Sequence, residues 1–241
     1  MTAEYLDVFD STTLCGEKWQ VQHFPLNDGS IWQYAEPQAQ VSALDGVLKI
    51  GVERFTRQHD SIAMFDNPKH LIMLREPVPL KTGGATSISC DMACVNHNGN
   101  SEELLDGFSA MVLGDFAHGL IFDFILSASC VGVVYERLPL PGVTPPGEEW
   151  LQVIQSPIIA RNEPGVFQHY EIRFDRSAGS CEWLLNGQRI YYLEQLPFEV
   201  QSVTPGLGLF TLRPQCPERG SRSNRGQGAT GQWRNLQVRY S

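Results

Sequence analysis

Two carboxylates interrupt two strongly apolar segments of the chain, Leu120–Ser127 and Val131–Arg137. Asp123 lies in the middle of the first segment and Glu136 near the end of the second. Desolvation in apolar surroundings favours the protonated form of a carboxyl group, and a pair of such groups can move protons as general acid and base. We therefore predict Asp123 and Glu136 as catalytic residues. Pairing with Arg137, Arg161 or Arg173, or exposure at a strand edge, is the structural alternative for either carboxylate.

Both segments have the β-branched and aromatic composition of strands, and Ala128–Cys130 between them has the length of a turn. Alternation along Leu120–Ser127 gives one wholly apolar face, and the opposite face is also apolar apart from its central carboxylate. A strand that is apolar on both faces has a core on one side and a second layer or a sheltered cleft on the other. We predict that the two strands form the floor of a concave cleft, in which Ile121, Ile125 and Val134 contact the substrate.

Further candidates come from titratable and aromatic residues near these strands. His118 precedes the first strand and could act as a catalytic base at the cleft rim, although a histidine at a loop or strand edge is the commoner case. Trp32 and Trp150 lie in less regular, more polar stretches, which suits contacts with a ligand. Tyr34 and Arg137 complete the predicted substrate-binding set.

Metal and cofactor motifs are weak. Cys90, Cys94 and His97 have some of the character of a metal site, but they lack the tight Cys-x2-Cys spacing and a fourth ligand of a zinc site. Buried free thiols explain them better. The sequence has no Ser–His–Asp motif, phosphate loop or dinucleotide fingerprint, so we expect no metal and no cofactor.

Composition narrows the class of protein. The 241 residues are 42% hydrophobic and 19% charged, with a net charge of -9. An acidic chain is a poor match for nucleic acid or an anionic membrane surface, and the one basic cluster, Arg213–Arg225, is interleaved with Gly, Ser and Pro as in a loop. The first residues lack the features of a secretory signal, and no apolar run reaches the ~18 residues of a membrane span, so we expect a cytoplasmic protein. The six cysteines have no regular spacing and are expected to be free.

Turn signals recur along the whole chain, and almost no segment has helical periodicity. Asp45-Gly46 and Asn186-Gly187 are typical hairpin turns. About a dozen strands without βαβ alternation, repeats or a linker indicate an all-β fold. We predict a two-sheet antiparallel β-sandwich that forms one domain over residues 1–241.

Three segments together resemble the concanavalin A-like lectin/glucanase superfamily of jelly rolls. The first is Phe9-Asp10 with Trp19 and the strand Val47–Val52 after its Asp-Gly turn. The second is the meander HYEIRFDRSAGSCEWLLNGQRIYYL, with its W-x-x-N-G hairpin, and the third runs from Gly206–Phe210 to Gly231–Val238. The resemblance implies a jelly-roll β-sandwich, with Trp183 and Trp233 at core positions. It says less about function, because lectins, glycosidases and unrelated domains share the fold.

The sequence departs from the superfamily at its catalytic motif. Laminarinase-like glycosidases carry E-x-D-x-x-E on one strand; the corresponding strand here, Leu120–Ser127, has only Asp123, and the motif occurs nowhere in the chain. The metal motif of legume lectins is not recognisable either. Asp123 and Glu136, on neighbouring strands, could still form a carboxylate pair, but strand register cannot be read from sequence.

Three functions remain open. The first is a cofactor-independent intracellular enzyme, such as a cyclase, isomerase or lyase, that uses acid/base chemistry on a small, largely apolar metabolite. The second is a carbohydrate-binding or glycosidase-like protein, and the third is a non-catalytic interaction domain. The expected partner is accordingly a small molecule or a glycan; the sequence does not indicate an oligomeric state.

Overall fold

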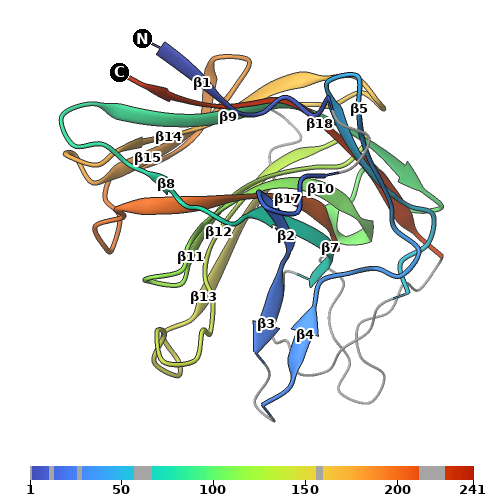
Figure 1. The fold of residues 1–241 in the computed structure, drawn as a ribbon, viewed down its shortest axis with the longest axis horizontal. Helices are drawn as coiled ribbons and strands as arrows, with labels where there is room; N and C mark the ends of the chain where they lie inside the picture. Colours follow the sequence, from blue (N-terminus) through green and yellow to red (C-terminus); the bar gives the residue numbers. More distant parts are fainter. Residues whose placement is uncertain (1, 11–13, 26–28, 57–66, 156–159, 212–225) are drawn as a thin grey trace.

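The computed structural model describes residues 2–10, 14–25, 29–56, 67–155, 160–211 and 226–241 (Figure 1). Almost all regular structure in these ranges is β-strand, as predicted. The exception is a short 3-10 turn, η1, at Leu104–Asp106. The predicted two-sheet antiparallel sandwich is confirmed, since the strands form two large antiparallel sheets that pack face to face.

The first sheet has eight strands. In spatial order they are β16 (Gln188–Leu193), β15 (Ser180–Leu185), β14 (Gln168–Asp175), β9 (Ala85–His97), β18 (Gly228–Tyr240), β6 (Val47–Val52) and β5 (Gln40–Leu44), with β1 (Thr2–Asp7) paired to β18. The N-terminal and C-terminal strands therefore lie side by side (Figure 1). The Asp45-Gly46 and Asn186-Gly187 turns close the β5–β6 and β15–β16 hairpins, and all four turn residues have positive φ.

The second sheet also has eight strands. Their order is β13 (Trp150–Gln155), β12 (Val131–Arg137), β11 (Leu120–Leu126), β10 (Phe108–Asp115), β17 (Ser202–Thr211), β7 (Asn67–Leu74) and β2 (Trp19–Val21), with β8 (Val78–Pro79) paired to β17. A separate hairpin, β3 (His23–Pro25) and β4 (Ile31–Gln33), extends from the β2–β7 side of this sheet, away from the first sheet (Figure 1). The predicted strands around Asp123 and Glu136 are thus β11 and β12, which pair directly.

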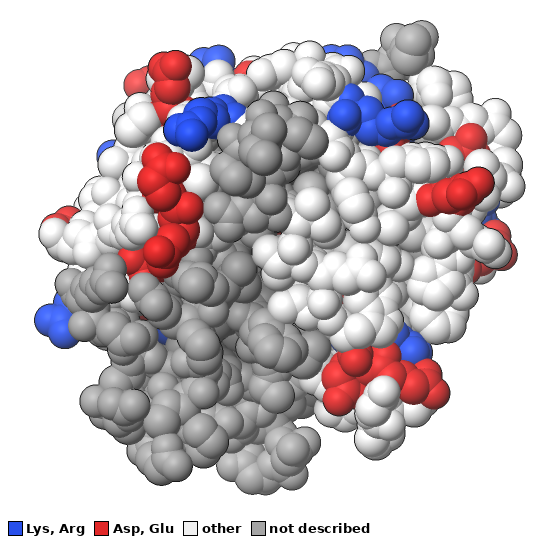
Figure 2. All heavy atoms as spheres, turned by 180° about the vertical axis from the view of Figure 1, so that it is seen from behind, with Lys and Arg blue, Asp and Glu red and all other residues white. Residues whose placement is uncertain are grey.

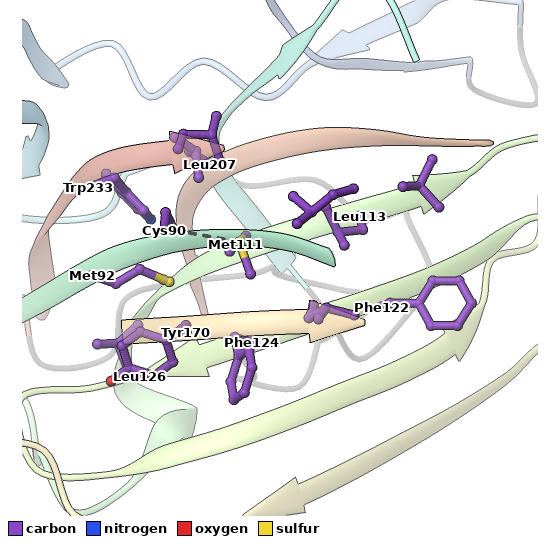
Figure 3. Close-up of a cluster of buried hydrophobic side chains, with 14 of the residues drawn as sticks. Cys90, Met92, Met111, Leu113, Phe122, Phe124, Leu126, Tyr170, Leu207 and Trp233 are labelled. Carbon is purple, nitrogen blue, oxygen red and sulfur yellow. Dashed lines mark hydrogen bonds between the residues drawn. The ribbon is translucent and has the colours of Figure 1, made fainter. Parts of the chain in front are cut away.

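The core between the sheets is built from the inward faces of both. Figure 3 shows Cys90, Met92, Tyr170 and Trp233 from the first sheet packed against Met111, Leu113, Phe122, Phe124, Leu126 and Leu207 from the second. Trp183 and Trp233 are completely buried, in agreement with their predicted core positions. Cys90 and Cys94 point into this core from β9 as free thiols, and burial raises the pKa of the Cys94 thiol to about 11, so it is un-ionised at neutral pH.

Every residue of β11 and β12 is buried, so the second sheet is covered on both of its faces at these two strands. Phe122, Phe124, Val133 and Tyr135 belong to the core between the sheets. Ile121, Ile125 and Val134, which alternate with them, belong to a second apolar cluster on the other side of the sheet. The face of the second sheet that points away from the first sheet, and that carries Asp123, is called the Asp123 face below.

Candidate functional site

Asp123 and Glu136 project from the same face of the second sheet. In the β11–β12 pairing, Asp123 lies opposite Val134 and Glu136 lies opposite Ile121. Directly paired residues share a face, as do residues two apart on one strand, so both carboxylates are on the Asp123 face as diagonal neighbours. Diagonal neighbours in antiparallel strands are about 7–8 Å apart, so the two side chains lie close together on this face.

The surroundings of this pair are apolar. The relative exposed areas of Asp123 and Glu136 are 0% and 1%. Val112 of β10 and Val134 of β12 flank Asp123 in its row across the sheet, and both are buried. Neither carboxylate is without an interaction partner. The pair is therefore desolvated. In such surroundings a carboxyl group interacts more strongly with a neighbouring polar group than it does in water.

Aromatic and aliphatic side chains lie over the same face. Phe24, Trp32 and Tyr34 pack into this second cluster from the β3–β4 hairpin and the residue after it. The Phe116 ring lies so close to Gly114 that an added Cβ would be 2.8 Å from its Cζ atom. Leu104 of η1 covers Gly132 in the same way, with 2.9 Å to its Cδ1 atom. These glycines let the covering side chains approach the backbone.

Hydrogen bonds hold the β11–β12 turn and hence the register that brings the carboxylates together. Asn162 Nδ2 donates to the Ser127 carbonyl at 2.7 Å, and the Ala128 N–H donates to Asn96 Oδ1 at 2.7 Å. The Ser127 hydroxyl accepts from the Cys130 N–H at 2.9 Å and donates to the Ser101 carbonyl. Because both strands leave from this turn, a fixed turn fixes the pairing of Asp123 with Val134.

Five of the predicted substrate-binding residues lie together with the carboxylates. Ile121, Ile125 and Val134 are on the Asp123 face, and Trp32 and Tyr34 belong to the cluster that covers it. Trp32 is in the β3–β4 hairpin and Tyr34 directly follows it; both are far from β11 in sequence, and only tertiary packing brings them here.

Trp150 and Arg137 are on the opposite face, so the structure does not bring them to the carboxylates. The two residues pair across β12 and β13, and the Trp150 ring packs edge-on against Tyr135 with 4.4 Å between ring centroids. Arg137 extends to the end of the sandwich, where its Nη1 donates to Glu148 Oε2 at 2.7 Å. Their face follows from strand alternation: Arg137 is one residue from Glu136 and therefore points the other way.

His118 also lies away from the pair. It is in the β10–β11 turn, where its Nδ1 is 2.6 Å from Asp115 Oδ2 and its ring stacks on Phe198 with 4.9 Å between centroids. Asp115 is on the core side of β10, and Phe198 packs against the core between the sheets. The contacts of His118 therefore belong to the end of the sandwich and not to the Asp123 face.

The sequence analysis missed a buried polar group near the start of β7. Lys69 and His70 have relative exposed areas of 1% and 8%, and Glu36 has 3%. Burial lowers the pKa of His70, and the nearby Glu36 carboxylate opposes this effect. His70 Nδ1 has no hydrogen-bond partner in the described part of the chain. Lys69-His70 directly precedes the apolar strand residues Leu71–Leu74. This position next to a buried strand could have indicated that the two polar side chains are buried as well. Nothing in the sequence indicates Glu36.

The described ranges show neither a metal site nor a membrane-spanning helix. They contain no group of three or more His, Cys, Asp or Glu side chains that could hold a metal ion. They contain no helix with the length and apolar character of a membrane span either. On the face shown in Figure 2, the acidic and basic side chains of the described residues form small, separate groups.

Comparisons with known proteins identify a family and a fold. A family model described as "Family of unknown function (DUF6081)" matches residues 6–241. No curated protein is significantly similar in sequence. Among solved structures, an endo-1,3-beta-glucanase from Streptomyces sioyaensis is similar with a TM-score of 0.63 and 12% identity, over 98% of this chain and 95% of that one.

Two other similar structures carry different printed activities. Porphyranase B from Zobellia galactanivorans has a TM-score of 0.54 and 13% identity, over 98% of this chain and 93% of that one. The alginate lyase AlgAT5 from Polysaccharide Lyase family 7 has a TM-score of 0.52 and 14% identity, over 93% of this chain and 95% of that one. At these identities the likeness shows the fold, which is the glucanase-type concanavalin A-like jelly roll, and the predicted resemblance in fold is confirmed.

Proposed function

The chain belongs to the DUF6081 family, and from the carboxylate pair on its second sheet we propose that it is a carbohydrate-active enzyme that cleaves glycosidic bonds. The observation that carries the proposal is the position of Asp123 and Glu136 as diagonal neighbours on one buried face. In this proposal the two side chains are the catalytic acid and base, and the Asp123 face binds the sugar.

The spacing of the pair suits this chemistry. Glycosidases use two carboxyl groups about 5–5.5 Å apart when they retain the anomeric configuration and about 6.5–9.5 Å apart when they invert it. Diagonal neighbours at about 7–8 Å, with side chains that can lean together or apart, fall within reach of both ranges. One carboxyl group would protonate the leaving oxygen, and the other would activate water or attack the sugar.

The fold supports the same proposal. The printed names of the similar structures include a glucanase, a porphyranase and an alginate lyase, and this chain spans nearly the whole length of each. The absent E-x-D-x-x-E motif means that the catalytic groups here would come from two neighbouring strands, β11 and β12, instead of from one. We treat residues 1–241 as one domain because both sheets share a single core.

A second candidate function is favoured by the apolar surroundings of the pair. Val112, Ile121, Ile125 and Val134 around Asp123 are aliphatic, whereas sugar hydroxyls need polar partners. A cofactor-independent cyclase, isomerase or lyase acting on a small apolar metabolite would use the same two carboxylates for proton transfer. In such an enzyme the enclosing side chains would order the substrate.

The test is a screen of purified protein against neutral and acidic polysaccharides, with release of reducing ends and of unsaturated products as the readouts. Asp123→Asn and Glu136→Gln are each expected to lower the rate by about 10²–10⁴-fold, which is the usual contribution of a general acid or base. Glu182→Gln, in the ion-pair group of β14 and β15, is the matched control and should keep full activity. Full activity in both site variants would refute the proposal. Cleavage of no glycan, together with saturable binding of apolar ligands that depends on Val134, would favour the second candidate.

A further inference from the structure

The end of the sandwich contains a pocket that is separate from the Asp123 face. Its walls are the β14–β15 turn, residues 175–180, and the loop between β16 and β17, residues 194–200. Its volume is about 480 Å³, within the roughly 300–1,000 Å³ range of small-molecule sites. We propose that this pocket is a second glycan-binding site, which takes an uncharged sugar unit and does no chemistry on it. The choice of ligand class rests on the proposed function.

The base of the pocket is apolar, and its aromatic ring is held in place. Phe174 and Val200 are buried beneath it, and the half-buried Phe198 lies at its wall. The His118 ring stacks on Phe198 at an interplanar angle of 10°, and the Arg137 guanidinium lies 4.7 Å from the Phe198 ring centroid. A ring supported in this way loses little conformational freedom when a ligand packs against it.

Hydrogen bonds also fix the polar walls. The Leu196 N–H donates to the Gly179 carbonyl at 2.7 Å, which joins the two walls. Arg176 donates to Glu199 Oε1 from Nε at 3.0 Å and from Nη2 at 2.6 Å. The Gly83 N–H donates to the Ser177 hydroxyl at 3.2 Å. The pocket is therefore formed before any ligand arrives, as small-molecule sites usually are.

Charge selects the class of ligand. The walls carry three carboxylates, on Asp175, Glu194 and Glu199, and one cation, Arg176, which is already paired with Glu199. This excess of negative charge disfavours uronates and sulfated sugars. Carboxylate and amide oxygens accept hydrogen bonds from hydroxyl groups, and the apolar base suits the C–H face of a sugar ring. The combination fits a neutral sugar better than an acidic one.

The pocket and the carboxylate pair are independent sites. No residue that lines the pocket belongs to the Asp123 face. The pocket also lies at one end of the first sheet and on the loop that connects it to the second, whereas Asp123 is in the middle of β11. Occupancy of the pocket would hold a polysaccharide on the protein while another part of the chain is cleaved.

The experiment follows the Ala178 methyl group, which is exposed at the pocket wall and gives a local signal. Full-length Asp123→Asn protein with 13C-labelled alanine methyls is titrated with laminaritriose, cellotriose and N-acetylchitotriose, and with trimers of uronic acid. We expect the Ala178 resonance to shift in a saturable manner with at least one neutral trimer, with a Kd at or below about 1 mM, and not to shift with the acidic trimers. Phe198→Ala should weaken that binding at least about tenfold, which corresponds to about 1.4 kcal/mol.

Two further variants keep the test decisive. Gln195→Ala alters an exposed residue of the pocket wall and provides the pocket variant if Phe198→Ala fails to fold. Tyr192→Ala removes an aromatic side chain that is 43% exposed and lies outside the pocket, so it should leave the titration unchanged. An Ala178 signal that is unmoved by every neutral trimer, or equal affinity in the pocket variants and Tyr192→Ala, would overturn the inference. Glycan cleavage without an Ala178 shift would refute this site alone, and a shift without cleavage by the wild-type protein would refute the proposed function alone.

Discussion

Asp123 on β11 and Glu136 on β12 are two residue pairs apart in the antiparallel ladder and project from the same face of the second sheet. Their positions come from two constraints that act together. Alternation within each strand decides which residues share a face, and the hydrogen-bonded turn that ends at Cys130 decides which residues lie opposite each other. A register shift by one residue would separate the two carboxylates onto opposite faces.

The first prediction follows from this proximity. If Asp123 and Glu136 act on one substrate, residues that act as a unit have non-additive effects. The double variant Asp123→Asn/Glu136→Gln should therefore have about the same rate as the less active of the two single variants. The rates of all four proteins on one cleaved glycan provide the measurement. Losses that multiply across the two sites would mean that the carboxylates work independently. Circular dichroism of each variant checks that the fold is retained.

Much of the fold could be predicted from local pattern. The apolar alternation along Leu120–Ser127 identified β11 to within one residue, and Asp-Gly and Asn-Gly identified two hairpins, because such turns need residues that tolerate positive φ. The resemblance in the meander from His169 to Leu193 matches the β14–β16 strands.

The rest depended on register and on tertiary contacts. Trp150 lies on the core side of β13 because it pairs with Arg137, and no local feature of its sequence specifies that pairing. His118 was predicted at a cleft rim because of its position before β11. The direction of its turn is set instead by contacts with Asp115 and Phe198, and Phe198 is on a distant loop.

The second prediction concerns the buried His70 and acid stability. Burial lowers the pKa of His70 below its ordinary value of 6.5, so the unfolded chain binds this proton more readily than the folded one. The free energy of unfolding should therefore fall as the pH drops from 6.5 towards the lowered folded-state pKa. His70→Gln should remove part of that loss, on the order of 1 kcal/mol.

Urea unfolding at several pH values between about 7.5 and 5 measures this difference. His23→Gln, at an exposed histidine of β3, is the control and should keep the pH dependence of the wild-type protein. An unchanged pH dependence in His70→Gln would show that other groups cause the acid loss.

The third prediction concerns Asp91 on the outer surface of the first sheet. Burial by itself would raise the pKa of Asp91, but hydrogen bonds from His169, Asn235 and Arg234 outweigh it and leave the pKa below the ordinary value of 3.8. The depressed pKa stabilises the folded state above the unfolded-state value, and the effect is lost as the pH falls through the folded-state value. Asp91→Asn should thus lower the free energy of unfolding by about 1 kcal/mol near neutral pH.

As the pH falls below the unfolded-state pKa of about 3.8 towards the lower folded-state value, the difference between Asp91→Asn and wild type should shrink, because the wild-type carboxyl group also becomes uncharged. Chemical denaturation at about pH 7 and pH 3 tests both limits. Asp10→Asn, at an exposed carboxylate, provides the comparison. A difference that is equal at the two pH values would attribute the loss to geometry and not to charge.

The fourth prediction concerns Gly231 in β18, where the Trp233 ring folds back over the backbone. A Cβ atom at Gly231 would lie 2.3 Å from Trp233 Cη2 and 2.8 Å from Ser109 Cβ, and Trp233 is completely buried. Gly231→Ala must displace a large ring inside a close-packed core, so we expect a loss of about 1–3 kcal/mol in the free energy of unfolding. Gly16→Ala is the control, because no atom lies within 4 Å of its added Cβ and its φ is not positive.

If the crowding has the stated cause, Trp233→Phe should cost less in the Gly231→Ala background than in the wild type, since the smaller ring makes room for the methyl group. Equal costs in the two backgrounds, measured by urea unfolding, would show that the ring and the glycine are not coupled.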